Sequence, residues 1–439
     1  MFEKRIISKS DFAPFKNLKS LFVAEKDHRN TLDTWRVLAI FWIVCQHCII
    51  ALGFDLTSAQ QLRILANNNF KIFSHASFAV DIFFVLSGYL IGGILIREKK
   101  NTGGINIKLF YIRRALRMLP LYYVVIALVI VARSIDFLPP RNYYAFSALP
   151  NLLFINNLIP LHLQFLPWSW TLAIEEQFYF LCPILIYFLA ISFAKIMKFF
   201  AFLLIGIMAL HFTIIYMTDL KIYWSIFRTL DLASYDRYLD LIYDKSYVRL
   251  SSIVLGVLAS YWSHLELDKK MFASKIKSFT WLLLAITVIV YVFNKMDYGP
   301  VQANKSLFFE CIYRELFCCG FIILMFASLH LKYLSRPFSL KIFHPLFQLS
   351  YGIYLIHYIV ADALVNSESF RKIINHDIPT PMQILGLGIL TFVISAILIL
   401  PLYIFIERPF INMRARLFSM REVSIPGVAN QAKSNSEKC

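Results

Sequence analysis

Charged residues are scarce in this sequence, and their scarcity excludes an ordinary soluble enzyme. They account for 16% of the 439 residues, whereas hydrophobic residues account for 59%. Soluble domains carry about a quarter charged residues. The apolar residues also gather in many runs that are long enough to cross a bilayer as helices. We therefore predict an all-α polytopic membrane protein.

No secretory signal peptide precedes the first apolar run, and cysteines are few. Residues 1–31 are polar and basic, which predicts a retained N-terminal tail. Six of the seven cysteines lie in predicted spans, so we expect no disulfides. The spacing of Cys45 and Cys48 also occurs in redox and metal sites, but an apolar helix favours small core residues there. We expect no metal site.

Nucleic-acid-binding motifs and internal repeats are also absent, although the net charge is +17. The lysines and arginines fall in alternate loops, which is the positive-inside pattern of membrane proteins. About ten transmembrane helices with both termini in the cytoplasm satisfy this pattern. We predict spans near residues 34–53, 76–96, 118–135, 171–193, 199–217, 248–263, 278–294, 307–330, 344–365 and 383–406.

A further apolar segment, residues 143–160, contains Pro150 and three asparagines. Counting it as a span inverts every later loop and breaks the charge pattern. We therefore expect a re-entrant or interfacial segment that is lined by protein. The predicted organisation is a cytoplasmic N-terminal tail (1–31), a membrane domain (32–410) and a cytoplasmic C-terminal tail (411–439).

An arginine and a histidine share one face of the first predicted span. Arg36 and His47 have ten residues between them. On a helix they project within about 20° of each other and lie about 16 Å apart along the axis. Arg36 then lies near a membrane surface, and His47 lies deeper. An ionisable residue inside a spanning helix is costly and marks a candidate functional site.

Four predicted helices carry ionisable residues at similar depth in the outer half of the membrane. Besides His47, these are Asp81, Glu175, Glu176 and His357. Each one alone is compatible with a structural residue that faces other helices. Together they predict a polar cavity that opens outward, because a charge that faces lipid is strongly unfavourable.

A basic cluster lies at the predicted cytoplasmic end of the helices. Arg113, Arg114 and Arg117 belong to the short helical run FYIRRALRMLP, and Arg36 enters the membrane on the same side. These arginines either set the topology or bind phosphates, since a guanidinium forks onto two phosphate oxygens. The residues alone leave both interpretations open.

Glycines and aromatic residues give two further patterns. Gly88 and Gly92 form a GxxxG pattern, which is typical of close helix packing and also leaves room for a thin ligand. The loop 218–247 is rich in aromatic residues, which is typical of an interfacial belt and is compatible with a sugar-stacking platform. The aromatic residues are Tyr223, Trp224, Phe227, Tyr235, Tyr238, Tyr243 and Tyr247.

Six motifs follow one another along the chain: LDTWRVLAIFWIVCQH, FAVDIFFVLSGYLIG, FYIRRALRMLPLYY, WTLAIEEQFYFLCP, SYGIYLIH and IERPF. In this order they resemble the motifs of the acyltransferase 3 family of integral-membrane O-acyltransferases. The resemblance covers about residues 32–410 and is specific because six motifs agree. The mid-chain span departs from the family pattern, since Ser251 and Ser252 stand where an acid often follows the arginine, here Arg249.

The resemblance implies acetyl transfer from cytoplasmic acetyl-CoA, a donor substrate, to a hydroxyl of an extracytoplasmic or lipid-linked glycan. Lipopolysaccharide O-antigen, capsule or exopolysaccharide would be the acceptor, at the bacterial inner membrane. No tightly bound cofactor is implied. His47 is assigned as the catalytic base, and its carboxylate partner is either Asp81 or Glu175. The implied donor-binding residues are Arg36, Arg113, Arg114, Arg117, Ser87, Gly88 and Tyr89, and the implied acceptor-binding residues are Trp170, Gln177, Tyr179 and His357.

Three alternatives stay open. In the first, the acceptor is peptidoglycan or a small-molecule hydroxyl, or the donor carries a longer acyl chain. In the second, Ser87 acts as a nucleophile and carries the acyl group transiently. In the third, the protein is a transporter or glycan exporter whose buried charges couple to protons, although the sequence shows no symmetric halves.

Overall fold

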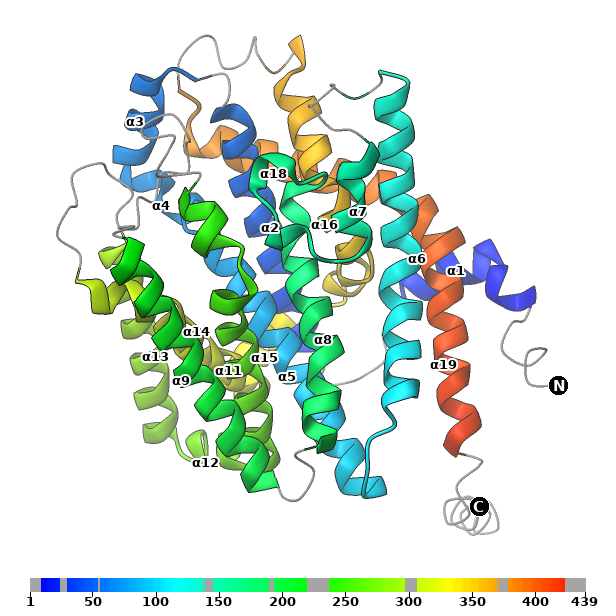
Figure 1. The fold of residues 1–439 in the computed structure, drawn as a ribbon, viewed down its shortest axis with the longest axis vertical. Helices are drawn as coiled ribbons and strands as arrows, with labels where there is room; N and C mark the ends of the chain where they lie inside the picture. The colour runs from blue at the N-terminus through cyan, green and yellow to red at the C-terminus, as the bar shows by residue number, and fades with distance from the viewer. Residues whose placement is uncertain are drawn as a thin grey trace.

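The protein is a bundle of long helices that run side by side, with shorter helices at both ends (Figure 1). The computed structural model describes residues 9–23, 30–53, 56–136, 138, 145–188, 193–218, 237–296, 306–368, 370 and 378–422. These residues form helices and no strand. The predicted all-α fold is confirmed.

Nine helices among the described residues are long and apolar enough to cross a membrane, which confirms a polytopic membrane protein. The side of the membrane on which each terminus lies stays a prediction. The helices are α2 (Asn30–Gly53), α5 (Ser77–Thr102), α6 (Ile107–Ser134), α8 (Trp170–Phe188), α9 (Phe193–Thr218), α13 (Lys275–Lys295), α14 (Leu307–His330), α16 (Phe343–Val365) and α18 (Pro381–Leu402).

The remaining predicted span, 248–263, corresponds to α11 (Ser246–His264), which is not among these nine helices. Its buried face carries Arg249, Ser251 and Ser252, which lower its apolar character. These side chains face α5 and other helices instead of lipid, so the protein interior supplies the partners that lipid does not.

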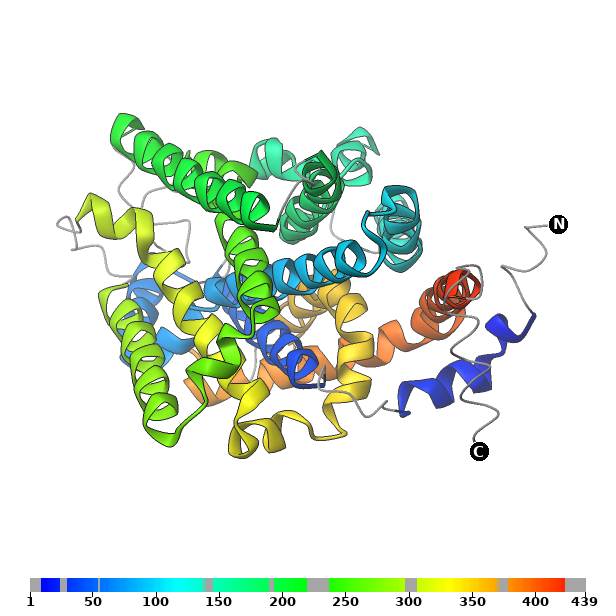
Figure 2. The same cartoon turned by 90° about the horizontal axis from the view of Figure 1, so that it is seen from below.

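Short helices connect the long ones. None of them is long enough to cross a bilayer. They are η2 (Lys9–Phe12), α1 (Pro14–Leu21), α3 (Ser58–Ala66), η3 (Asn68–Phe70), α4 (Lys71–Ser74), η8 (Leu239–Tyr243), α12 (Leu267–Met271), α15 (Lys332–Phe338), η9 (Tyr403–Glu407) and α19 (Arg408–Glu422). In both views, α1 and α19 lie at the edge of the bundle, with α19 beside α6 (Figures 1 and 2).

Residues 145–169 form only short turns, as expected for a segment that is not a full span; residues 143 and 144 lie outside the described residues. The turns are η4 (Ala145–Ala148), α7 (Leu149–Leu152), η5 (Asn156–Leu158), η6 (Leu161–Leu163) and η7 (Pro167–Ser169). Buried asparagines hold them in place: Asn151 Nδ2 donates to Ser169 Oγ (2.8 Å), and Asn157 Nδ2 donates to Ser246 Oγ (2.7 Å). The position of this segment relative to the membrane stays a prediction.

Cys45 and Cys48 are free thiols in the core, where α2 packs on α18. A Cβ added at Gly388 would lie 2.5 Å from Cys45 Sγ, and Cys48 Sγ lies 3.5 Å from Thr391 Oγ1. Both thiols therefore act as small residues that let two helices approach closely.

The GxxxG glycines lie where α5 packs on α11. A Cβ added at Gly88 would lie 2.0 Å from the Ile253 carbonyl oxygen, and one added at Gly92 would lie 2.4 Å from Ser260 Oγ. The glycines therefore permit close helix packing and are not left open as a passage for a ligand.

Substituting Gly88 with alanine is expected to push α5 and α11 apart and to lower stability by about 1–3 kcal/mol. The measurement is thermal unfolding of the purified protein in detergent. Gly206 in α9 is the matched control, because a Cβ added there meets no atom within 4 Å. Equal melting temperatures for Gly88→Ala and the wild type would contradict the close packing.

Candidate active site

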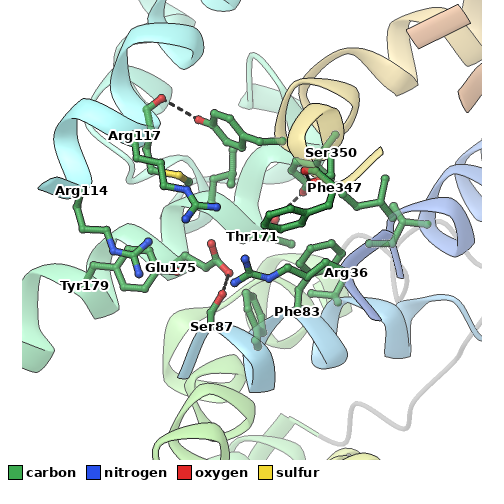
Figure 3. A pocket seen from close by; sticks show the side chains of 18 residues that line it. Arg36, Phe83, Ser87, Arg114, Arg117, Thr171, Glu175, Tyr179, Phe347 and Ser350 are labelled. Atoms are coloured by element: carbon green, nitrogen blue, oxygen red, sulfur yellow. Dashed lines mark hydrogen bonds between the residues drawn. The ribbon is translucent and has the colours of Figure 1, made fainter. Parts of the chain in front are cut away.

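A cavity lies between α2, α5, α6, α8 and α16 and contains about 720 Å³ of empty space, part of it open to solvent (Figure 3). Each helix contributes side chains from one face. The lining residues are Arg36, Ile40 and Ile43 from α2, Val80, Phe83, Phe84 and Ser87 from α5, Arg114, Arg117 and Met118 from α6, Thr171, Leu172, Glu175 and Tyr179 from α8, and Phe347, Ser350, Tyr351 and Tyr354 from α16.

Three guanidinium groups line this cavity, from Arg36, Arg114 and Arg117 (Figure 3). Aromatic rings support two of them: Arg114 Cζ lies 4.2 Å from the centre of the Tyr179 ring, and Arg36 Cζ lies 5.8 Å from that of Phe347. Such stacking orients a guanidinium and leaves its N–H groups free for an anion.

A buried carboxylate lies among these arginines. Glu175 Oε1 accepts a hydrogen bond from the Ser87 hydroxyl, and the charges of Arg36 and Arg114, which line the same cavity, interact with the carboxylate. The sequence predicted Glu175 at the depth of His47, but the structure places it with the arginines. The reason is that α8 begins at Trp170, directly after the short turns, so its first residues already lie within the bundle.

The two predicted site histidines are in contact, one helical turn beyond the lining residues Ile43 and Tyr354. His47 Nδ1 lies 2.6 Å from His357 Nε2, and the rings are nearly parallel, with 4.9 Å between their centres. His357 Nδ1 lies 2.6 Å from the Tyr354 carbonyl oxygen. His357 is fully buried, whereas His47 is partly exposed.

These contacts determine which ring nitrogens carry protons. A carbonyl oxygen only accepts hydrogen bonds, so His357 Nδ1 must carry a proton. The Nε2 atom of neutral His357 is then an acceptor, and His47 Nδ1 must donate to it. Neutral His47 therefore has its available lone pair on Nε2, and a general base needs such a lone pair to accept a proton.

Asp81 has other partners. Its carboxylate binds Arg249 and Arg314, each at 3.1 Å, and accepts from Ser252 Oγ at 2.9 Å. All of these groups are buried. Within the described residues, no hydrogen bond joins His47 to Asp81 or Glu175. The structure thus pairs His47 with His357, and neither carboxylate proposed from the sequence is its partner.

The acceptor- and donor-binding residues proposed from the sequence divide into two groups. Arg36, Arg114, Arg117, Ser87 and Tyr179 line the cavity, whereas Arg113, Gly88, Tyr89, Trp170, Gln177 and His357 do not. Some of the second group have clear structural contacts: Tyr89 donates to Ser263 Oγ (3.3 Å), and Gln177 Nε2 donates to Asn157 Oδ1 (2.9 Å). The Trp170 ring lies 4.9 Å from Arg249 Cζ.

Most of the aromatic loop lies outside the described residues, including Tyr223, Trp224, Phe227 and Tyr235. The remaining members contact protein. The Tyr243 ring centre lies 5.3 Å from that of Trp170, and the Tyr247 hydroxyl donates to the Leu241 carbonyl at 2.5 Å. Tyr238 packs near Tyr243, with ring centres 6.2 Å apart. A sugar-binding role for this loop stays a prediction.

Sequence reasoning missed the hydroxyl groups of Thr171 and Tyr354. Their oxygens lie 2.5 Å apart on the cavity wall, and the Tyr354 hydroxyl donates to the Trp168 carbonyl, so Thr171 donates to Tyr354. The SYGIYLIH motif contains Tyr354 and was the available signal, because this residue lies one turn before His357.

Comparison with known proteins agrees with the resemblance seen in the motifs. The peptidoglycan O-acetyltransferase OatA of Listeria monocytogenes serovar 1/2a is 30% identical over 317 residues, which cover 66% of this chain and 46% of that protein. The O-acetyltransferase OatA of Staphylococcus aureus strain NCTC 8325 is 35% identical over 136 residues, which cover 29% of this chain and 23% of that protein. The chain therefore spans less than half the length of these relatives.

No solved structure matches the chain. The family described as "Acyltransferase domain" matches residues 29–400, which run from α2 into the last turn of α18 and include all the residues that line the cavity. The chain belongs to this family, the acyltransferase 3 family of integral membrane proteins.

Proposed function

We propose that this protein is a membrane O-acyltransferase that moves an acetyl group from acetyl-CoA to a hydroxyl of a glycan. The observation that carries the proposal is the arrangement around one cavity. Arginines line it, and a histidine pair with an available base lies one helical turn beyond Ile43 and Tyr354. An acyl-CoA needs a cationic site for its phosphates, and its thioester needs a base near the acceptor hydroxyl.

The donor is proposed to bind with its phosphates near Arg36, Arg114 and Arg117. Guanidinium groups bind phosphate oxygens through paired, charge-assisted hydrogen bonds. The pantetheine arm is thin and partly apolar, which suits the part of the wall formed by Ile40, Ile43 and other apolar side chains. Arg36 and His47 lie on the same helix about 16 Å apart, so a bound donor has to extend along α2 to reach the base.

In the proposed reaction, His47 Nε2 takes the proton from the acceptor hydroxyl as its oxygen attacks the thioester carbonyl. A C–O bond forms and the C–S bond breaks. The proton on His47 then passes to the leaving thiolate. His357 acts as a positioning residue, because its Nε2 accepts from His47 Nδ1 and keeps the lone pair of His47 on Nε2.

The acceptor is proposed to be a glycan outside the cytoplasm, at the bacterial inner membrane. Lipopolysaccharide O-antigen, capsule and exopolysaccharide are the first candidates from the sequence. Peptidoglycan is a second candidate, since the Listeria relative is named a peptidoglycan O-acetyltransferase. That name describes the relative, of which this chain covers 46%.

Mass spectrometry of the surface glycans and the peptidoglycan tests this function. A strain that lacks the protein is compared with the same strain complemented by the wild type or by His47→Ala. We expect one glycan to lose an acetyl-sized mass in the deletion strain and to regain it only with the wild-type gene. Identical glycan masses in all three strains, with normal protein levels in the two complemented strains, would contradict the proposal.

A further inference from the structure

The terminal helix α19 brings another arginine to the basic cluster, here Arg36, Arg113, Arg114 and Arg117. Arg414 lies on α19, which packs beside α6 in both views (Figures 1 and 2). Arg414 lies close enough to Arg117, Arg114 and Arg113 for its charge to interact with theirs. The family match ends at residue 400, so this arginine belongs to a part of the chain that the family comparison does not cover.

The N-terminal segment holds α19 in this position. The buried Asp11 carboxylate forms an ion pair with Arg416, and Asn412 Nδ2 donates to Asn17 Oδ1 at 3.2 Å. Asn17 Nδ2 also donates to the Ile404 carbonyl at 3.0 Å, just before α19 begins. Asp11 and Asn17 are both buried, so these contacts are shielded from water. α19 is therefore packed in a defined position against the rest of the protein.

Positive charge is in excess at this end of the cavity. Arg408 and Arg414 join the four arginines of the basic cluster, and among the described residues Glu175, Glu176 and Glu407 are carboxylates whose charges interact with members of this group. The Nε atoms of Arg36 and Arg408 are buried and have no hydrogen-bond partner among the described residues. Guanidinium groups gathered in this way repel one another unless an anion binds between them.

We propose that Arg414 binds a phosphate of the nucleotide part of the acyl thioester donor, so that α19 completes the donor site. This inference rests on the proposed function. Residues that only set topology need to lie in a loop on one side of the membrane and need no docking. Arg414 is instead half-buried on a helix that packs beside α6 and that two side-chain contacts, Arg416 with Asp11 and Asn412 with Asn17, tie to the N-terminal segment.

The test compares two donors with the purified full-length protein in lipid nanodiscs. Acetyl-CoA carries the nucleotide phosphates, whereas S-acetylpantetheine carries the same thioester without them. We expect Arg414→Ala to raise the KM for acetyl-CoA about tenfold, as for the loss of one charged hydrogen bond, and to leave kinetics with S-acetylpantetheine unchanged. Arg414→Lys retains the charge and is expected to recover part of the affinity.

Arg336→Ala is the matched control, because it removes an exposed arginine from α15 and is expected to leave both donors unaffected. If Arg414→Ala lowers activity with both donors equally, Arg414 has only a structural role and the inference is wrong. If Arg114→Ala weakens acetyl-CoA selectively and Arg414→Ala does not, only the inference about α19 fails. If the wild type uses both donors equally well, the donor site in the proposed function fails as well.

Discussion

Replacing His47 with alanine is expected to slow acyl transfer by about 10²- to 10⁴-fold, the usual contribution of a general base. The loss is expected in kcat, because His47 is proposed to act in the chemical step, whereas Arg36, Arg114 and Arg117 are proposed to hold the donor phosphates. The measurement is the initial rate of acetyl transfer by purified protein at several donor concentrations. Unchanged elution in size-exclusion chromatography and unchanged acetyl-CoA binding control for folding. A variant with wild-type kcat would remove His47 from the proposed mechanism.

Substitutions of His357 test whether this residue positions His47 for catalysis. His357→Leu removes the acceptor for His47 Nδ1, so the lone pair of His47 is no longer held on Nε2. We expect kcat to fall at least tenfold with little change in the donor KM. His357→Gln offers an amide oxygen to the same N–H and is expected to restore much of the rate. Equal activity of the Leu and Gln variants would indicate that His357 only fills space.

Substituting Asp81 with asparagine is expected to destabilise the fold by about 3–5 kcal/mol. The change leaves the guanidinium groups of Arg249 and Arg314 buried without their shared counter-ion. Thermal unfolding in detergent and the yield of folded protein measure the effect. Glu266→Gln is the matched control: it removes a carboxylate from an exposed pair with Lys269 (2.7 Å), and water screens such a pair so well that little change in stability is expected.

This prediction also separates a structural role of Asp81 from a catalytic one. A triple variant that replaces Asp81, Arg249 and Arg314 with apolar residues of similar size is expected to recover much of the lost stability, since no buried charge is then unpaired. If Asp81→Asn instead keeps wild-type stability and loses only kcat, Asp81 acts in catalysis and the structural assignment is wrong.

The charged residues of the cavity were recognisable from the sequence, but their grouping was not. Helical periodicity placed Arg36 and His47 on one face of α2, and the motifs drew attention to Ser87, Glu175 and His357. The depth of a residue along its predicted span was a poorer guide to its neighbours in the structure. Glu175 was expected near His47, yet the short turns before α8 start that helix inside the bundle and place Glu175 beside Arg36 and Arg114.

Apolar runs of spanning length already identify a polytopic helical membrane protein, because they leave the backbone no other way to satisfy its hydrogen bonds in lipid. Which buried charges are partners became visible only when the helices were seen packed together. His47 meets His357 across 310 residues, and Asp81 meets Arg249 and Arg314 across 168 and 233 residues. Such pairs escape prediction because periodicity gives the face of one helix, whereas the neighbour of that face depends on the packing of all the helices.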